Sequence, residues 1–321
     1  AVEIVEKVKP RKKFFGLFGT EPGTYEISIK TKEKREEVKE KKNFTPKTEK
    51  VEKNPKYEKQ EKIEKAGKPL KNWDINIYRG ILTGYNKAFI IDKETKDRLI
   101  AKSSKNAEII RPILRGRDIK RYRADFADLW IINSHNGYGN IPAVNIEDYP
   151  DIKVHLDCYI ADLQKRKDKG ITPYNLRSCI YMEDFSKQKI VYPNMTKFMP
   201  FFLDIDGYMV NQKCFIITGN NIGFLSAFFN SSLFKFCFKD NFPELFGDTR
   251  ELSKIFFDKI PVIEINTQMD SKFRDLVLEI QKLKQCNKST KHIEIQIDEM
   301  IFDLYGLSIN ERKTIGFIEL Q

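Results

Sequence analysis

The chain has 321 residues, a formal net charge of +11 and a pI near 9.2. Its length allows one large domain or two smaller ones, and a hydrophobic content of 40% is enough to form a core. The basic excess is uneven, because residues 1–70 hold 20 Lys and Arg against 13 Asp and Glu, which leaves 37 against 33 in the remainder. A polyanionic partner is favoured, but the mildly basic remainder means that net charge alone does not establish nucleic-acid binding.

The cysteines argue against a structural zinc site. Five are spread along the chain with no Cys-x-x-Cys pair, and only three histidines accompany them. Their odd, dispersed number is typical of reduced thiols, so we expect a cytoplasmic protein with no metal site. No secretion signal opens the sequence, and the longest apolar stretch, 222–238, is interrupted by Asn, Ser and Lys. We therefore expect no membrane association.

The first part of the chain, 1–69, differs in composition from the rest. Two β-like segments, 1–8 and 24–31, flank a Phe- and Gly-containing stretch, and residues 31–68 are dominated by Lys and Glu. Few apolar residues and no clean helical stripe favour a solvated linker. A long exposed helix is the main alternative. A basic arm that follows DNA is a further one, against which the interspersed Glu residues argue.

Apolar content rises at residue 70, where we place the start of a folded body. The pattern predicts strands, later interrupted by helices, and two amphipathic helices at the end of the chain joined near 287–289. We predict three parts: 1–69, a domain over 70–263, and a helical segment over 264–321. The predicted strands are 75–78, 88–91, 129–132, 189–192, 201–204 and 214–218, and the predicted earlier helices are 152–166 and 222–236.

The stretch Trp73–Asp92 has alternating apolar residues on both sides of Thr83-Gly84-Tyr85-Asn86. This pattern predicts a strand, a turn and a second strand, as in a hairpin. Gly84 can adopt a positive φ, and Asn86 can bond its own backbone, so the turn needs no ligand. A DNA contact by Asn86 or Lys87 is a secondary hypothesis.

The stretch Arg111–Tyr122 places five basic side chains around Gly116. Guanidinium groups near a flexible backbone suit phosphate and guanine contacts. An exposed turn followed by a core strand is the structural alternative. Asp118 could orient Arg117 or Arg121.

Two further segments hold polar or basic side chains. The loop 131–140 carries His, Asn and Tyr groups that can read base edges but are also ordinary turn residues, and 164–170 is a basic helix end or loop. Solvated surface and anchoring on the DNA backbone both remain open for 164–170. The candidate DNA-contacting residues are Arg79, Asn86, Lys87, Arg115, Arg117, Lys120, Arg121, Arg123, His135, Asn136, Tyr138, Lys165, Arg166, Lys167, Arg177 and Lys197.

A catalytic site is not indicated by the sequence. The chain has no Pro-Pro pair, as an adenine methyltransferase loop would need, and no glycine-rich cofactor loop after a strand. Glu-x-Lys triplets occur in the Lys- and Glu-rich part, where they arise by chance, so a metal-dependent nuclease is disfavoured. His155 lies within a predicted helix and is expected to be a packed or solvent-exposed histidine.

Several ordered motifs resemble the TaqI-like specificity domain of type IIG restriction–modification enzymes. They cover residues 70–311 in the family's order, beginning with the two stretches above. The later motifs are TPYNLRSCIYMEDFSKQKIVYPNMT (172–196), with a "Leu-Arg" strand before a "Phe…Lys-Ile" strand, FLSAFFNSSLFKFCFK (224–239), FFDKIPV (256–262) and IDEMIFDLYGLSINE (297–311).

The resemblance implies an α+β fold: a twisted, β-rich target-recognition domain with packed helices and a C-terminal helical segment. It implies a non-catalytic module that reads a short double-stranded DNA target for an adenine methyltransferase or endonuclease, in a bacterial or archaeal cytoplasm and at the nucleoid when bound. S-adenosylmethionine and Mg²⁺ would then belong to the catalytic partner. A catalytic fragment of a type IIG methyltransferase–nuclease and a protein-interaction scaffold are the alternatives.

Overall fold

A computed structural model describes residues 62–318, which belong to one compact unit of the chain. The predictions for 1–30 and for most of 31–68 therefore lie outside the described residues. The strands are β1 (Lys68–Pro69), β2 (Ile75–Arg79), β3 (Ile90–Asp92), β4 (Ile110–Leu114), β5 (Ile119–Lys120), β6 (Arg123–Ala124), β7 (Leu129–Ile132), β8 (Lys189–Pro193), β9 (Met195–Thr196), β10 (Phe202–Asp204), β11 (Met209–Val210), β12 (Cys214–Gly219), β13 (Arg250–Glu251) and β14 (Pro261–Val262). The helices are α2 (Asn86–Phe89), α3 (Lys93–Lys102), α4 (Pro150–Asp157), α5 (Ile160–Lys165), α6 (Ile222–Phe229), α7 (Ser232–Phe238), α8 (Lys254–Phe257), α9 (Thr267–Gln285), α10 (Lys291–Leu304) and α11 (Ile309–Ile315).

A four-stranded antiparallel sheet in the order β10-β8-β12-β2 stands between two hydrophobic cores. Successive side chains of a strand point to opposite faces, and both faces of this sheet are covered. Thus Ile190 and Ile217 pack into the core beneath α6, α7 and α9, whereas Val191 and Ile216 pack into the other core. This double burial explains why the central strands β8 and β12 read as nearly continuous apolar runs, whereas the edge strand β2 alternates apolar and polar residues.

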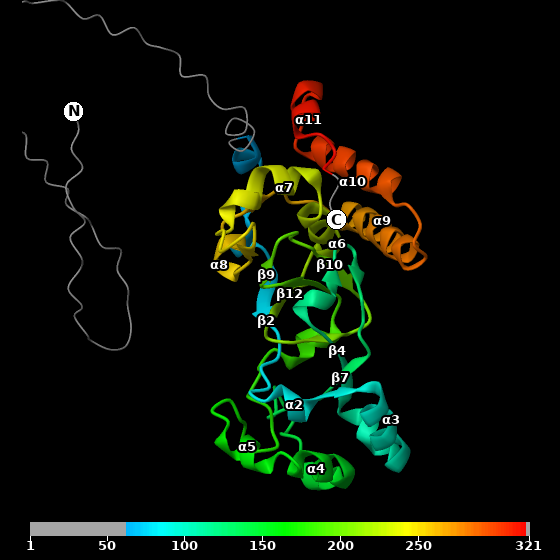
Figure 1. The fold of residues 1–321 in the computed structure, drawn as a ribbon. Helices are drawn as coiled ribbons and strands as arrows, with labels where there is room; N and C mark the ends of the chain where they lie inside the picture. Colours follow the sequence, from blue (N-terminus) through cyan, green and yellow to red (C-terminus); the bar gives the residue numbers. More distant parts are fainter. Residues whose placement is uncertain (1–61, 319–321) are drawn as a thin grey trace, which may run out of the picture. The chain divides into compact units, whose positions relative to one another are not determined.

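The second core lies under a mixed sheet in the order β11-β4-β7-β3, in which β11 runs parallel to β4. Helices α2 to α5 gather at this end of the molecule, and α6, α7, α9 and α10 gather at the opposite end (Figure 1). The observed architecture is the mixed α+β fold that the sequence predicts. None of the helices within 62–318 is long and apolar enough to cross a lipid bilayer.

Several predicted elements are confirmed. The strand predicted over 129–132 is β7, and the two amphipathic helices at the end of the chain are α9 and α10, joined through 286–290. A third, short helix, α11, follows them and was not predicted. Its start is marked by Ser308 and Glu311, which form a reciprocal capping box.

The predicted hairpin over Trp73–Asp92 is wrong, because its two strands belong to different sheets. β2 pairs with β12, and β3 pairs with β7. After β2 the chain does not reverse; the N–H of Ile81 donates to the carbonyl of Val210 at 2.7 Å, which carries it to the other sheet. Residues 86–89 then form α2 before β3 begins, in place of a strand over 88–91.

Both long helices predicted in the middle of the chain are broken. The segment 152–166 divides into α4 and α5, and 222–236 divides into α6 and α7. Ser231 causes the second break, because its side chain caps α7 by accepting from the N–H of Phe234 at 3.1 Å. The expected "Leu-Arg" strand is an isolated bridge between Lys169 and Leu176.

A buried ion pair joins β8 to β10. Lys189 and Asp204 are cross-strand partners, both have 0% exposure, and Nζ lies 2.5 Å from Oδ2. Asp204 also accepts from the N–H groups of Asp206 and Tyr208. Burial lowers the pKa of Lys189, and Asp204 opposes that shift. Removing one charge leaves the other buried and uncompensated.

We expect Asp204→Asn to lower the free energy of unfolding by about 3–5 kcal/mol, because the Lys189 ammonium would lose its buried counter-charge. Urea unfolding at pH 7 measures this change. Asp97→Asn, which removes the carboxylate of the exposed Lys93–Asp97 pair, is the matched control and should unfold like the wild type. Equal effects of the two substitutions would contradict the role given to burial.

A second buried carboxyl group links α10 to α7. Asp298 accepts from the backbone N–H of Ser232 at 2.9 Å and from its hydroxyl. Burial raises the pKa of Asp298 to about 6, although the bonds from Ser232 act to lower it. The stability that the neutral form provides is fully present below the ordinary Asp pKa and is lost as pH rises through about 6.

Between pH 7 and pH 5 we expect the wild type to gain about 1 kcal/mol of stability relative to Asp298→Asn. Unfolding titrations of both proteins at each pH measure this difference. His135 and His155, whose pKa values burial lowers, are present in both proteins, so their contribution to the pH dependence cancels in the comparison. Asp303→Asn on the exposed face of α10 should show no such pH-dependent difference.

Candidate nucleic-acid interface

The β5–β6 hairpin presents one basic residue and buries the next. Its two-residue turn consists of Arg121 and Tyr122, and Tyr122 has φ of 59°. The backbone N–H of Tyr122 donates to the carbonyl of Phe201 at 3.0 Å, which fixes the turn against the body of the molecule. Lys120, on the preceding strand, is consequently exposed, whereas the side chains of the turn are buried.

Arg121 connects the hairpin to two helices. Its guanidinium donates to the carbonyl of Asn230 from Nη2 at 2.8 Å and from Nε at 3.2 Å, and Nη1 pairs with Glu294. Burial would raise the pKa of Glu294, but Arg121, Thr290 and Lys284 together hold it below its ordinary value. Arg121 is only 6% exposed. The prediction that it contacts DNA is therefore corrected, because its guanidinium is committed to the core.

The 3₁₀ turn Gly116–Asp118 supplies the next part of the surface. Arg115 donates three bonds to the Asp118 carboxylate, from its backbone N–H at 2.8 Å, from Nε at 2.9 Å and from Nη2 at 2.8 Å, and these close the turn. Asp118 therefore orients Arg115, not Arg117 or Arg121 as the sequence suggested. Arg117 remains exposed.

The facing surface comes from the connection between β11 and β12. Gly80 lets this connection approach, because a Cβ there would lie 2.1 Å from the carbonyl oxygen of Asn211. The carbonyl of Lys213 accepts from the N–H of Asn194 at 2.8 Å, which joins the connection to the segment leading into β9. Lys213 itself is exposed.

Together these segments enclose a cavity of about 550 Å³, adjoined by a smaller one of about 350 Å³ that shares Lys120 and Arg121 with it. We call the two cavities the basic groove. Among the described residues that line them, none is an Asp or Glu. The lining residues are Arg115, Gly116, Arg117, Ile119, Lys120, Arg121, Arg123, Pro193, Asn194, Met195, Thr196, Phe198, Pro200, Asn211, Lys213, Lys284, Asn287 and Lys288.

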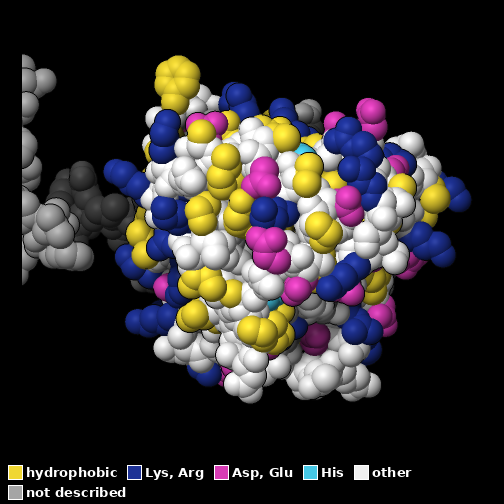
Figure 2. Space-filling view, turned by 90° about the horizontal axis from the view of Figure 1, so that it is seen from below, with side chains coloured by type: hydrophobic (Ala, Val, Ile, Leu, Met, Phe, Trp, Pro, Cys, Tyr) yellow, Lys and Arg dark blue, Asp and Glu magenta, His cyan; other side chains and the backbone are white. Residues whose placement is uncertain are grey.

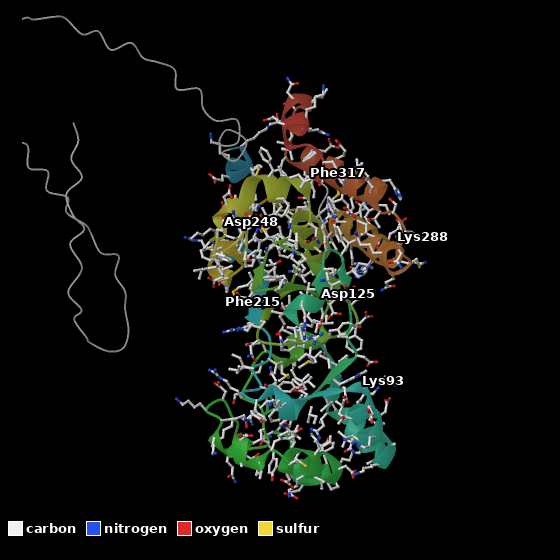
Figure 3. All side chains as sticks on the ribbon, in the orientation of Figure 1. Lys93, Asp125, Phe215, Asp248, Lys288 and Phe317 are labelled. Carbon is white, nitrogen blue, oxygen red and sulfur yellow. The ribbon has the colours of Figure 1, made fainter. Side chains whose placement is uncertain are left out.

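Two of these basic side chains form ion pairs with carboxylates that do not line the groove. Arg123 pairs with Asp125 at 2.7 Å, and Lys284 pairs with Glu294 at 3.4 Å. Lys288 lies at the α9–α10 connection, and Asp125 follows β6 (Figure 3). The groove therefore extends from the β-rich part onto the C-terminal helices, and its positive charge is concentrated at exposed Arg and Lys side chains.

A separate cavity of about 310 Å³ brings together Arg79 and Arg177. It neighbours the basic groove, because Gln212 lines it while the residues on either side of Gln212 line the groove. Arg79 is anchored through Nε to the carbonyl of Gln212 at 2.8 Å, and Arg177 pairs with Asp168 at 3.2 Å.

The polar side chains of the loop 131–140 form hydrogen bonds that hold the loop and connect it to neighbouring segments. Asn136 donates to the hydroxyl of Ser178 at 2.7 Å and accepts from the N–H of Ile171 at 2.7 Å. Burial lowers the pKa of His135, whose Nδ1 accepts from the N–H of Gly137 at 3.2 Å. Tyr138 stacks edge-on against His135. These residues stay predictions as base readers, but their polar groups already support the loop.

Arg166 is a second buried arginine. Its guanidinium donates to the carbonyls of Thr83, Pro173 and Asn175 and lies 4.6 Å from the ring centre of Phe89. The prediction that Arg166 contacts DNA is corrected, because the side chain ties three loops together beneath the surface.

The other candidates lie outside the groove and stay predictions: Asn86, Lys87, Lys165, Lys167 and Lys197 are exposed. Asn86 accepts from the hydroxyl of Thr83 at 2.6 Å, so the turn is held by a bond between two side chains and not by the backbone bond of Asn86 that the sequence suggested. Figure 2 shows the end formed by α4 and α5, where hydrophobic and acidic side chains are mixed with Lys and Arg. This end is less uniformly basic than the groove.

Sequence reasoning missed several groove residues: Asn194, Phe198, Asn211, Lys213, Lys284 and Lys288. Lys213 follows Asn211-Gln212 between two apolar strands, which is a turn signal that could have drawn attention to it. Lys288 lies in the predicted connection between the C-terminal helices. Within residues 62–318, His, Cys, Asp and Glu side chains form no group of three that could hold a metal ion.

Comparisons with known proteins identify one matching family and several similar solved structures. Residues 111–262 match the model of the TaqI-like C-terminal specificity domain. The fold is similar to that of the type IIL restriction-modification enzyme MmeI, solved in complex with DNA, with a TM-score of 0.54 and 11% identity over 75% of this chain and 34% of that enzyme. The type IIG restriction endonuclease BpuSI is similar at a TM-score of 0.45 and 13% identity, over 78% of this chain and 33% of the other.

This chain thus spans about a third of the length of these two enzymes. No curated protein matches it. The family match includes the 3₁₀ turn, the β5–β6 hairpin and the β11–β12 connection, and so most of the basic groove. The resemblance seen in the sequence motifs is confirmed: residues 111–262 match the TaqI-like C-terminal specificity domain of restriction–modification enzymes.

Proposed function

We propose that this chain is a DNA sequence-recognition module of a restriction–modification system, and that it directs an adenine methyltransferase or endonuclease to a short target. The observation that carries the proposal is the basic groove, which combines cations from several separate segments within and beside the matched domain. The relation to a specificity domain and the fold shared with an enzyme solved on DNA support the same function.

Phosphate contacts would dock the duplex. Exposed Arg117, Lys120 and Lys213 surround the larger cavity, and Lys284 and Lys288 extend the positive surface along one side. Such contacts fix register and orientation but carry no sequence information. Because they release counterions from DNA, they make affinity fall steeply as salt rises.

Base selection would come from polar side chains in the same cavity. Asn194 and Asn211 line it beside the cations. Oδ1 of Asn211 already accepts from the N–H of Lys213 at 3.1 Å, and Oδ1 of Asn194 is buried, so the amide N–H groups are what these side chains can offer to acceptors on base edges such as N7. Each is held by its backbone: Asn194 through Lys213 and Leu252, and Asn211 through Leu114. Rigid placement of this kind suits discrimination between bases.

The chemistry would be performed by a catalytic methyltransferase or methyltransferase–nuclease, supplied as a separate subunit or as another part of a longer chain. That partner would flip the target adenine and hold S-adenosylmethionine and Mg²⁺. This chain would contribute docking and target choice in the cytoplasm, bound to double-stranded DNA.

The first test is selection from a randomised duplex library by the whole purified chain at roughly 50 and 200 mM salt, a range over which phosphate-dominated binding changes strongly. We expect one short asymmetric sequence to be enriched, most clearly at the higher salt, where non-specific binding is weaker. Retention of DNA with no enrichment at either salt, both alone and with the catalytic subunit added, would contradict the proposal.

The second test separates phosphate contacts from structural arginines. We expect Arg117→Ala, Lys120→Ala and Lys213→Ala each to weaken binding to all sequences and to reduce the slope of log affinity against log salt by roughly 1. Fluorescence anisotropy titrations over a series of salt concentrations measure that slope.

The matched control is Lys272→Ala, since Lys272 is exposed on α9 roughly 18 Å along the helix from Lys284. It should leave the slope unchanged. Arg121→Met should instead lower the free energy of unfolding, because buried Glu294 would lose its guanidinium partner and keep only the more distant Lys284 and the hydroxyl of Thr290. If Lys272→Ala lowers the slope as much as the groove variants do, binding is diffuse and the groove is not the interface.

A further inference from the structure

Phe198 is an apolar side chain in a basic setting. The residue is 55% exposed, and it lines the basic groove together with Arg117, Lys120 and Lys213. Leaving a phenylalanine this exposed forgoes part of the stabilisation that full burial of the ring would provide. A duplex bound through its phosphates would bring base edges to the same cavity.

The backbone on either side of the ring is held firmly. The N–H of Phe198 donates to the hydroxyl of Thr196 at 3.1 Å. Met199 adopts φ of 48°, a conformation that non-glycine residues rarely take. Two residues later, Phe201 exchanges bonds with the side chain of Asn230, which donates to its carbonyl at 2.9 Å and accepts from its N–H at 3.3 Å.

The main restraint on this loop is Lys235 of α7. Its Nζ donates to the carbonyl of Phe198 at 2.8 Å and to that of Met199 at 2.5 Å. The side chain is buried, and among the described residues no carboxylate forms an ion pair with it. Burial of an amine whose partners are two carbonyl groups and, at 5.7 Å, the ring of Phe201 is costly without a counter-charge. In return, Lys235 fixes the backbone of the loop that carries Phe198.

We propose that Phe198 contacts the C5-methyl group of a thymine in the major groove of the bound duplex and so determines one position of the target, with Lys235 as its positioning residue. This inference rests on the proposed function. Phenylalanine recognises a thymine methyl through apolar contact. The basic neighbours of the ring favour DNA over a protein partner, because they match the phosphates that flank a base edge.

A second exposed phenylalanine, Phe246, lies outside the basic groove and serves for comparison. Phe246 is 89% exposed at the tip of the hairpin that precedes β13, with acidic residues Glu244 and Asp248 close by in the same hairpin. It does not line the basic groove. Its acidic surroundings disfavour contact with DNA, so Phe246→Ala is a matched control for the loss of an exposed phenyl ring.

The experiment compares the sequences selected from a randomised duplex library by wild type, Phe198→Ala and Phe246→Ala. The preference for thymine at one position should be lost in Phe198→Ala alone. On the wild-type target, Phe198→Ala should bind roughly tenfold more weakly, within the range expected for one misread base pair. The dependence of its affinity on salt should not change, because no phosphate contact is removed.

Replacing that thymine by deoxyuridine removes only the methyl group. We expect this replacement to weaken binding by wild type and by Phe246→Ala but not by Phe198→Ala, so that the two changes are not additive. Phe198→Leu, which keeps an apolar contact, should restore part of the preference. Lys235→Met should weaken the preference at the same position. If Lys235→Met does not fold, the Phe198 variants still decide the inference.

Three results would overturn the inference. A wild type that enriches a target which Phe198→Ala also selects unchanged would refute the role of Phe198 and leave the proposed function intact. A loss of affinity in Phe198→Ala that is equal for all sequences and insensitive to deoxyuridine would show contact with the sugar–phosphate backbone. A wild type that enriches no sequence, either alone or with the catalytic subunit added, would refute the proposed function and this inference together.

Discussion

The guanidinium of Arg121 ties the basic groove to the helical end of the molecule. It holds the carbonyl of Asn230, at the junction of α6 and α7, and the carboxylate of Glu294 on α10. Asn230 in turn fixes Phe201, at the end of the loop that carries Phe198. One buried cation therefore sets the distance between the hairpin that exposes Lys120 and the C-terminal helices that complete the groove.

This arrangement explains the break between α6 and α7. A continuous helix over 222–236 would direct the carbonyl of Asn230 along the helix axis toward the N–H of Phe234, whereas in the structure that N–H donates to Ser231 and the carbonyl accepts twice from Arg121. Ser231 ends the interruption by capping α7, and Ser232 contacts Asp298 on α10. Because buried polar groups must find partners, these few residues define how the helices pack on the sheet. The polar Asn-Ser-Ser interruption in an apolar sequence thus separates α6 from α7 and connects both helices to the rest of the core.

Sequence patterns predicted those features that depend on local periodicity. The strand at 129–132 was predicted correctly because it is a short, continuous apolar run, and the paired C-terminal helices because their apolar residues recur at helical spacing. The hairpin over Trp73–Asp92 was not, because alternation identifies a strand but not its partner. The partner of β2 is β12, more than 130 residues away in the chain, and Gly80 permits the contact that diverts the chain.

In the candidate site, likewise, the sequence shows where basic residues cluster but not which of them are exposed. The basic run at 111–121 correctly indicated a positive surface, yet its five bases divide among different roles once the chain is folded. Arg121 is buried, Arg115 closes a turn, and Arg117 is exposed in the groove. Lys213 and Lys288, distant in sequence, join Arg117 and Lys120 only through the tertiary structure. A polyanion would encounter this local cluster of positive charges, which the net charge of the chain does not reveal.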